Sequence, residues 1–187
     1  HKRLSIVDLS THGHQPMNFL DRYWITYNGE IYNYIELKKE LEKLGYAFAS
    51  QTDTEVILAA YDAWGVECQN KFNGMWAFAI FDIEKEVIFI SRDRFGIKPL
   101  YYYQDERKFI FSSEIKSLLE NDDVITYPNI DKLKDYYNLG SQEDSKDTVF
   151  TNIYRFNNAS YVVLDAKNFT DELSENTYWD YEVNSSS

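Results

Sequence analysis

Apolar residues recur every three or four positions in two segments of the N-terminal half. Between Asn33 and Gly45 this spacing predicts a helix with Asn33 as its N-terminal cap. Between Thr52 and Gly65 it predicts a second helix, in which Thr52 and Glu55 have the spacing of a capping box. Both helices are expected to end at a glycine and to turn one apolar face toward the rest of the protein.

Dense apolar runs of strand length occupy most of the remaining chain. They predict strands at residues 3–7, 23–27, 75–81, 87–91, 100–103, 109–112, 149–154 and 161–164. Further helices are predicted at residues 114–120 and 131–139. The strand at 23–27 is expected to stop at Asn28-Gly29, a frequent turn dipeptide. Because the runs are dense and helices precede a series of antiparallel-type strands, the sequence predicts an α+β fold with helices packed on sheets.

Composition and charge narrow the class of protein. The 187 residues suffice for one well-buried domain, and the 17% of aromatic residues favours packed sheets over a helical bundle. The net charge of −12 argues against nucleic acid as a partner, because an acidic surface repels phosphate. No apolar run approaches the ~18 residues of a membrane span. The single cysteine, Cys68, excludes a multi-cysteine metal site and fits a reducing, cytoplasmic setting.

Polar residues near the ends of predicted elements supply the candidate chemistry. An isolated Asn-Gly is usually only a tight turn, but Arg3 and Asp53 accompany Asn28-Gly29-Glu30 in this sequence. The guanidinium of Arg3 can bind a carboxylate through two hydrogen bonds. The carboxylates of Asp53 and Glu30 can accept from an ammonium group. Alternatively, Asp53 only complements the dipole of the second predicted helix, which Thr52 can already cap, and Glu30 is only a solvated turn carboxylate.

Together these residues resemble the glutamine pocket of the class II glutamine amidotransferases. That resemblance implies an N-terminal-nucleophile hydrolase-type layered αββα sandwich with antiparallel sheets. Longer segments resemble the glutamine-hydrolysing asparagine synthetases in particular, and they follow one another as in that family: residues 3–8, 13–17, 28–33, 91–101 and 112–116. Residues 91–101 are expected to serve packing, and Tyr178-Trp179 resembles the aromatic pair that closes this domain.

The resemblance implies a role for each residue of the pocket. Arg3 would bind the carboxylate of L-glutamine, and Asp53, with Glu30, would bind its ammonium group. The Asn28 side chain and the Gly29 N–H would form an oxyanion hole, in which the loss of one donor typically costs ~10²–10³ in rate. Glycine at this place allows a close backbone approach and unusual dihedral angles. Backbone groups of four further residues would line the pocket: Leu4, Ser5, Ile6 and Val7.

The nucleophile of the family is a cysteine that opens the mature chain and is activated by its own α-amine. This sequence begins at His1, inside a family motif, so we expect that it lacks the nucleophile and has no glutaminase activity by itself. Cys68 lies in a segment that resembles a structural part of the family, and a buried, unreactive thiol is expected there. His12 and His14 lie in a loop without a third ligand, so no metal site is expected.

The expected organisation is one amidotransferase domain at residues 1–183, a polar tail at 184–187 and a C-terminal synthetase domain outside this sequence. The resemblance implies that this synthetase domain uses ATP and Mg²⁺ to convert aspartate to asparagine, and that this chain itself holds no cofactor. Two alternatives stay open: another acceptor, such as a sugar of a surface polysaccharide, or a non-catalytic glutamine-binding module. A missing first strand would leave an unpaired sheet edge, which allows a homodimer.

Overall fold

The computed structural model describes residues 14–106, 108–140, 145–167 and 173–181. Two antiparallel sheets form its centre. The larger sheet has the order β1-β2-β3-β4-β8-β9, with bounds Met17–Phe19, Tyr23–Ile31, Gly74–Asp82, Val87–Arg92, Ser160–Asp165 and Asn176–Thr177. The smaller sheet has the order β6-β5-β7, with bounds Phe109–Ser112, Tyr101–Gln104 and Ile153–Arg155. The strand predicted at residues 3–7 lies outside the described residues.

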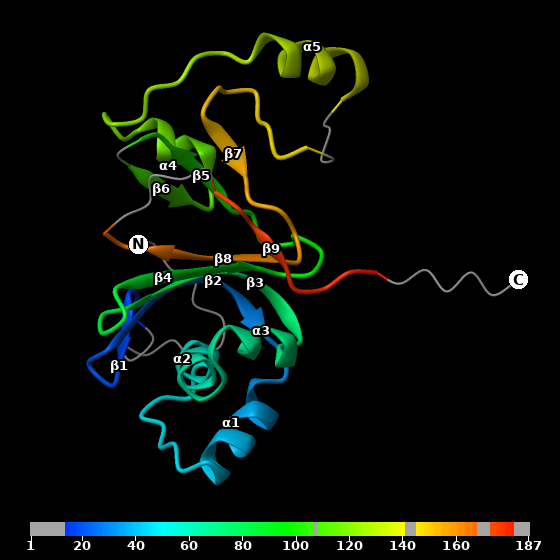
Figure 1. Cartoon of the computed structure of the whole chain (residues 1–187). Helices are drawn as coiled ribbons and strands as arrows, with labels where there is room; N and C mark the ends of the chain where they lie inside the picture. Colours follow the sequence, from blue (N-terminus) through cyan, green and yellow to red (C-terminus); the bar gives the residue numbers. More distant parts are fainter. Residues whose placement is uncertain (1–13, 107, 141–144, 168–172, 182–187) are drawn as a thin grey trace, which may run out of the picture.

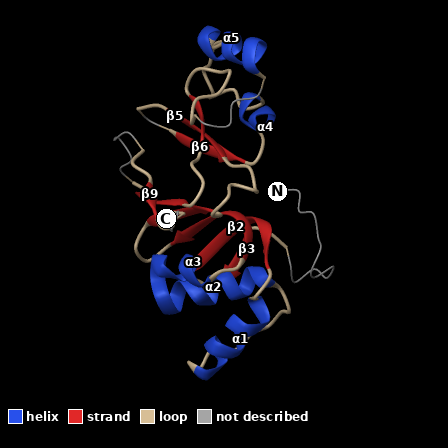
Figure 2. Cartoon of the chain, turned by 90° about the vertical axis from the view of Figure 1, so that its right-hand side faces the viewer, coloured by secondary structure: helices blue, strands red, loops and turns tan. Residues whose placement is uncertain are grey.

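Helices lie on the outer sides of the two sheets (Figure 1). On the large sheet these are α1 (Tyr34–Lys43), α2 (Asp53–Trp64) and α3 (Cys68–Lys71), which follows the short 3-10 helix Gly65–Glu67. Beyond the small sheet lie α4 (Ile115–Leu119) and α5 (Ile130–Leu139). Figure 2 shows the same succession from the side, helix on sheet on sheet on helix. The predicted layered α+β fold with antiparallel sheets is therefore confirmed.

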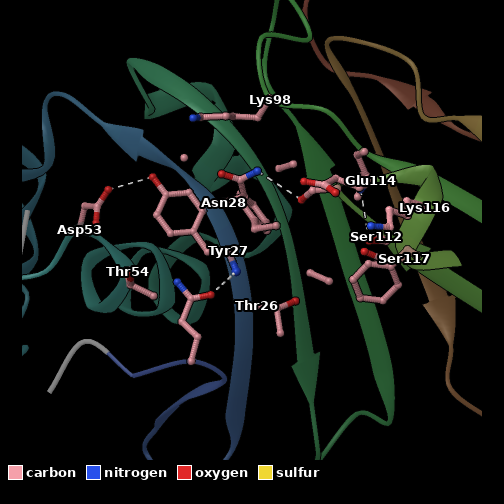
Figure 3. A pocket seen from close by; sticks show the side chains of 18 of the residues that line it. Thr26, Tyr27, Asn28, Asp53, Thr54, Lys98, Ser112, Glu114, Lys116 and Ser117 are labelled. Carbon is pink, nitrogen blue, oxygen red and sulfur yellow. Dashed lines mark hydrogen bonds between the residues drawn. The ribbon is translucent and has the colours of Figure 1, made fainter. Parts of the chain in front are cut away.

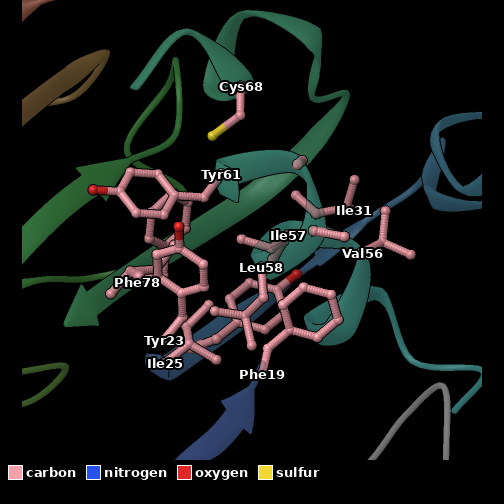
Figure 4. Packing of buried hydrophobic residues seen from close by; sticks show 14 of the residues in the cluster. Phe19, Tyr23, Ile25, Ile31, Val56, Ile57, Leu58, Tyr61, Cys68 and Phe78 are labelled. Atoms are coloured by element: carbon pink, nitrogen blue, oxygen red, sulfur yellow. The ribbon is translucent and has the colours of Figure 1, made fainter. Parts of the chain in front are cut away.

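Apolar side chains fill both faces of the large sheet. On the helical face, buried residues of α2 such as Ile57 and Leu58 pack against β2 and β3 residues such as Ile25 and Phe78 (Figure 4). A second cluster joins residues of the large sheet, such as Ile90, to residues of the small sheet. This burial on both faces is why the strand sequences are dense in apolar residues instead of alternating.

The second predicted helix has the expected boundaries. The Glu55 N–H donates to the Thr52 hydroxyl oxygen over 3.2 Å, so Thr52 caps α2. The Glu55 carboxylate accepts from the backbone N–H groups of Ala49 and Ser50 at 2.8 and 2.7 Å, so it secures the preceding loop instead of Thr52. The Gly65 N–H donates to the Tyr61 carbonyl and closes the helix.

Two local predictions for the first half of the chain are wrong. β2 does not stop at Asn28-Gly29 but continues to Ile31, because residues 28–31 pair with β3. A Cβ atom on Gly29 would lie 2.2 Å from the Met75 carbonyl oxygen, so glycine is needed for close approach and not for a turn. Asn33 makes no side-chain cap; its amide binds the Lys71 carbonyl and the Asn73 N–H and so ties α1 to the start of β3.

The segment after β4 is organised by one buried carboxylate. Asp93, which is fully buried, accepts hydrogen bonds from the backbone N–H groups of Trp76, Phe95, Ile97 and Lys98 at 2.9–3.2 Å. These contacts fold the loop between β4 and β5 and tie it to β3. The geometry agrees with the packing role predicted for residues 91–101.

We expect Asp93→Ala to lower the free energy of unfolding by at least about 3 kcal/mol, because it leaves several buried N–H donors without an acceptor. Urea unfolding followed by tryptophan fluorescence measures the change. Asp165→Ala is the matched control and should cost under about 1 kcal/mol, since the exposed Asp165 carboxylate accepts from the Lys167 N–H and from no other backbone N–H of the described residues. Equal losses in the two variants would contradict the role assigned to Asp93.

Candidate active site

A cavity of about 910 Å³ lies between the two sheets and the start of α2. Its lining includes residues of β2, of α2 and of the segment that follows β6 (Figure 3). The volume is within the range of small-molecule sites, ~300–1,000 Å³. Three of the predicted pocket residues line it: Asn28, Gly29 and Asp53.

One edge of β2 supplies backbone donors to this cavity. The Tyr27 N–H donates to Gln15 Oε1 at 2.6 Å, and the Ile31 N–H donates to Asp53 Oδ2 at 3.0 Å. Alternate residues of a strand direct their N–H groups to the same edge, so the Gly29 N–H lies between these two and points away from β3. No hydrogen bond joins it to another residue of the described ranges. It is therefore a backbone donor that borders the cavity.

Asn28 contributes a second donor at the same place. It is half-buried and paired with Ala77 of β3. Its Nδ2 donates to the Ser113 hydroxyl oxygen over 3.2 Å, across the space between the two sheets (Figure 3). A side-chain amide and the next backbone N–H thus face one cavity, which is the arrangement that an oxyanion hole needs.

Asp53 is the first residue of α2, and only 3% of its surface is exposed. Its Oδ2 accepts from the Tyr27 hydroxyl at 2.8 Å and from the Ile31 N–H at 3.0 Å. Burial first, and then the neighbouring Asp53, hold the pKa of Tyr27 well above its usual range, so Tyr27 remains a donor. Because Thr52 caps α2, Asp53 does more than complement the helix dipole: it is fixed against β2 beside the cavity.

The remaining predicted pocket residues do not meet at this place in the described structure. Arg3, and with it the segment 3–7, lies outside the described residues, and so does His12. Glu30 is half-buried within β2, on the same face as Asn28, but it does not line the cavity. It is a strand residue and not part of a turn.

Several residues that line or support the site were not predicted individually. Gln15 is 5% exposed and accepts the Tyr27 N–H, and Ser113 accepts from Asn28. Both lie in segments that resemble the family, residues 13–17 and 112–116. The resemblance therefore marked these segments but assigned no chemical role to the two residues. Thr54, beside Asp53, also lines the cavity, and its fully buried hydroxyl has no partner within the described part of the chain.

Cys68 is fully buried at the start of α3 and belongs to the same core cluster as Tyr61 (Figure 4). Burial raises the pKa of its thiol far above the usual value, so the thiolate form is suppressed. It does not line the cavity. The position and the raised pKa agree with the expected unreactive thiol.

We expect iodoacetamide at pH 8 to leave Cys68 unmodified in the folded protein and to alkylate it once the protein is unfolded in urea. Mass spectrometry of the intact chain counts the added groups. The unfolded sample is the internal control, since it shows that the reagent was active. Alkylation of the folded protein at the rate of a free thiol would contradict the burial.

Neither a metal site nor a membrane span is found in the described ranges. No group of three or more His, Cys, Asp or Glu side chains there could hold a metal ion. Nor is any helix there long and apolar enough to cross a membrane.

Solved structures share the fold. Glutamine phosphoribosylpyrophosphate amidotransferase from Bacillus subtilis superposes with a TM-score of 0.60 over 91% of this chain and 33% of that chain, at 15% identity. An allosteric regulatory enzyme of purine biosynthesis gives a TM-score of 0.54 over 82% of this chain and 29% of that chain, at 17% identity. The chain thus shares the layered α+β fold of these two solved structures.

The sequence places the chain more narrowly. The family model described as a glutamine amidotransferase domain matches residues 1–179, and the chain belongs to that family. A putative glutamine-hydrolysing asparagine synthetase 2 of Methanocaldococcus jannaschii is 42% identical over 96% of this chain and 37% of its own length. Asparagine synthetase 3 of Bacillus subtilis is 36% identical over 97% of this chain and 29% of its own length. The chain thus spans about a third of these relatives.

Proposed function

We propose that this chain is the glutamine-hydrolysing domain of a larger enzyme that makes asparagine from aspartate with ATP. The observation that carries the proposal is the convergence of Asn28, Gly29 and Asp53 on one cavity from two separate elements. The names and lengths of the relatives support the larger enzyme, since both are described as glutamine-hydrolysing asparagine synthetases.

In the proposed complex, L-glutamine lies in the cavity with its ammonium group at Asp53. The Oδ2 atom of Asp53 is already engaged by Tyr27 and Ile31, whereas its Oδ1 makes no hydrogen bond to another described residue. Oδ1 would accept from the ammonium. Arg3 would bind the α-carboxylate, with the backbone of residues 4–7 along the pocket and Glu30 as a further acceptor.

The side-chain amide of glutamine would then face Asn28 and Gly29. A cysteine thiolate attacks the amide carbon, so that a sulfur–carbon bond forms and the carbonyl oxygen becomes an oxyanion. Asn28 Nδ2 and the Gly29 N–H would stabilise that charge. The carbon–nitrogen bond then breaks, the nitrogen leaves as ammonia after it takes up a proton, and water hydrolyses the thioester to glutamate and thiol. Because Cys68 is buried away from the cavity, the proposal requires a cysteine outside this sequence.

The proposal assigns the remaining chemistry to the rest of the polypeptide. ATP and Mg²⁺ would bind in a synthetase domain, which would receive the ammonia from this domain. No residue of this chain would be a ligand of either cofactor. We propose that the enzyme is cytoplasmic and has no nucleic acid or membrane partner. We also propose that it forms a homodimer through a sheet edge. The net charge of −12 supports the exclusion of nucleic acid.

The direct test is a product assay on the full-length protein with glutamine, ATP, Mg²⁺ and aspartate. We expect equal amounts of glutamate and asparagine, and no asparagine when ATP or aspartate is omitted. If glutamate forms without asparagine, and a sugar acceptor is aminated in an amount equal to the glutamate, then the acceptor is the sugar and not aspartate. Absence of glutamate under every condition would leave only a glutamine-binding module and would overturn the proposal.

A further inference from the structure

The segment 112–116 resembles the asparagine synthetases, yet nothing in the chemistry above uses it. In the structure it starts at the last residue of β6 and borders the cavity opposite β2. Ser113 accepts a hydrogen bond from Asn28 Nδ2 at 3.2 Å, and the two residues are 85 positions apart in the sequence. We propose that Ser113 is a positioning residue that orients the amide of Asn28 for glutamine hydrolysis. The inference rests on the proposed function, because it assigns Asn28 to the oxyanion hole.

An asparagine needs such a partner if it is to stabilise an oxyanion. Its side-chain amide carries a donor NH₂ and an acceptor oxygen on one planar group, and rotation about χ2 is broad and roughly two-fold. In one orientation Nδ2 faces the substrate oxygen; in the other Oδ1 does, and it would repel the negative charge. The Ser113 hydroxyl oxygen accepts one hydrogen of Nδ2. In the first orientation this contact holds the plane of the amide in place and leaves the second hydrogen of Nδ2 for the substrate.

Ser113 is well placed to serve as a fixed partner. It directly follows Ser112, which pairs with Tyr101 in the ladder between β6 and β5. The chain beyond it is held by the α4 residue Leu118, which is 1% exposed. The Ser112 hydroxyl accepts from the Glu114 N–H at 3.2 Å, so it secures this turn locally. The contact with Asn28 therefore connects a rigid part of the small sheet to the edge of the large one.

Ser113→Ala in the full-length protein should lower kcat for glutamine hydrolysis by about 3- to 10-fold and leave KM for glutamine nearly unchanged, because one neutral hydrogen bond is lost from a group that acts in the transition state. Ser113→Thr keeps the hydroxyl and should restore most of the rate. In an Asn28→Ala background, Ser113→Ala should have no further effect. Ser145→Ala is the matched control, since Ser145 does not line the cavity and its hydroxyl accepts from the Asp147 N–H at 3.1 Å.

Each outcome decides the matter. A similar loss of kcat in Ser113→Ala and Ser145→Ala, or a further loss in the Asn28→Ala background, would show a purely structural role and overturn the inference. If Ser113→Ala leaves kcat unchanged while Asn28→Ala lowers it severely, the inference is also overturned, but the proposed function stays intact. If Asn28→Ala is itself silent, the proposed oxyanion hole fails, and this inference fails with it.

Discussion

Asn28→Ala should lower kcat for glutamine hydrolysis by roughly 10²–10³-fold in the full-length protein, with a much smaller change in KM. The amide of Asn28 faces the cavity from β2, next to the Gly29 N–H, and the two are the donors that we propose for a developing oxyanion. In the ground state the glutamine carbonyl is neutral, so the loss is felt mainly in the transition state. Steady-state assay of glutamate release measures it.

The matched control for this change is Asn18→Ala on the neighbouring strand β1. Asn18 Nδ2 donates to the Tyr23 carbonyl over a long 3.4 Å, and the residue does not line the cavity. Its kcat should remain within about 2-fold of that of the unaltered protein, since one long hydrogen bond away from the cavity contributes little. If the two variants lose the same activity, Asn28 acts through the sheet and not through the oxyanion.

Asp53→Asn should weaken glutamine binding by roughly 10- to 100-fold, because the proposed charge-assisted hydrogen bond to the ammonium group would become a neutral one. Asparagine keeps an oxygen that can accept from Tyr27 and Ile31, so the start of α2 should persist. Calorimetric titration with glutamine gives the dissociation constant. Glutaramate, which lacks the α-ammonium, serves as a second ligand, and its affinity should hardly change.

Asp62→Asn on the same helix is the control for Asp53. Asp62 also holds two tyrosines, since it accepts from the hydroxyls of Tyr23 and Tyr46 at 2.6 Å, but it does not line the cavity. Glutamine binding should be unaltered in this variant. Equal weakening in both variants, or equal weakening toward glutaramate, would mean that Asp53 supports the fold and not the ammonium group.

The parts of the structure that follow from neighbours in sequence could be predicted. α2 begins at Thr52 because its hydroxyl caps the Glu55 N–H three residues later, and that spacing is visible in the sequence. The prediction that Thr52 leaves Asp53 available was confirmed by the geometry, in which Asp53 contacts β2 instead of capping the helix. The strand at 109–112 was likewise predicted with its observed bounds.

The parts that depend on distant residues could not be predicted in the same way. Asn28-Gly29 has the composition of a turn, and only the pairing of β2 with β3 extends the strand through it. Gly29 is required by the Met75 carbonyl, which lies far away in sequence. The contact between Asn28 and Ser113 likewise needs the two sheets to face each other, so family resemblance marked the segment without revealing its geometry.

The central claim is that one cavity binds free glutamine between Asp53 and the Asn28–Gly29 pair. A crystal structure of the full-length protein with bound glutamine, its nucleophile replaced to prevent turnover, tests this most directly. We predict the ammonium group at Asp53 Oδ1 and the side-chain carbonyl oxygen about 2.7–3.1 Å from both Asn28 Nδ2 and the Gly29 nitrogen. Glutamine bound elsewhere, or bound here with its amide directed away from Asn28 and Gly29, would contradict the account.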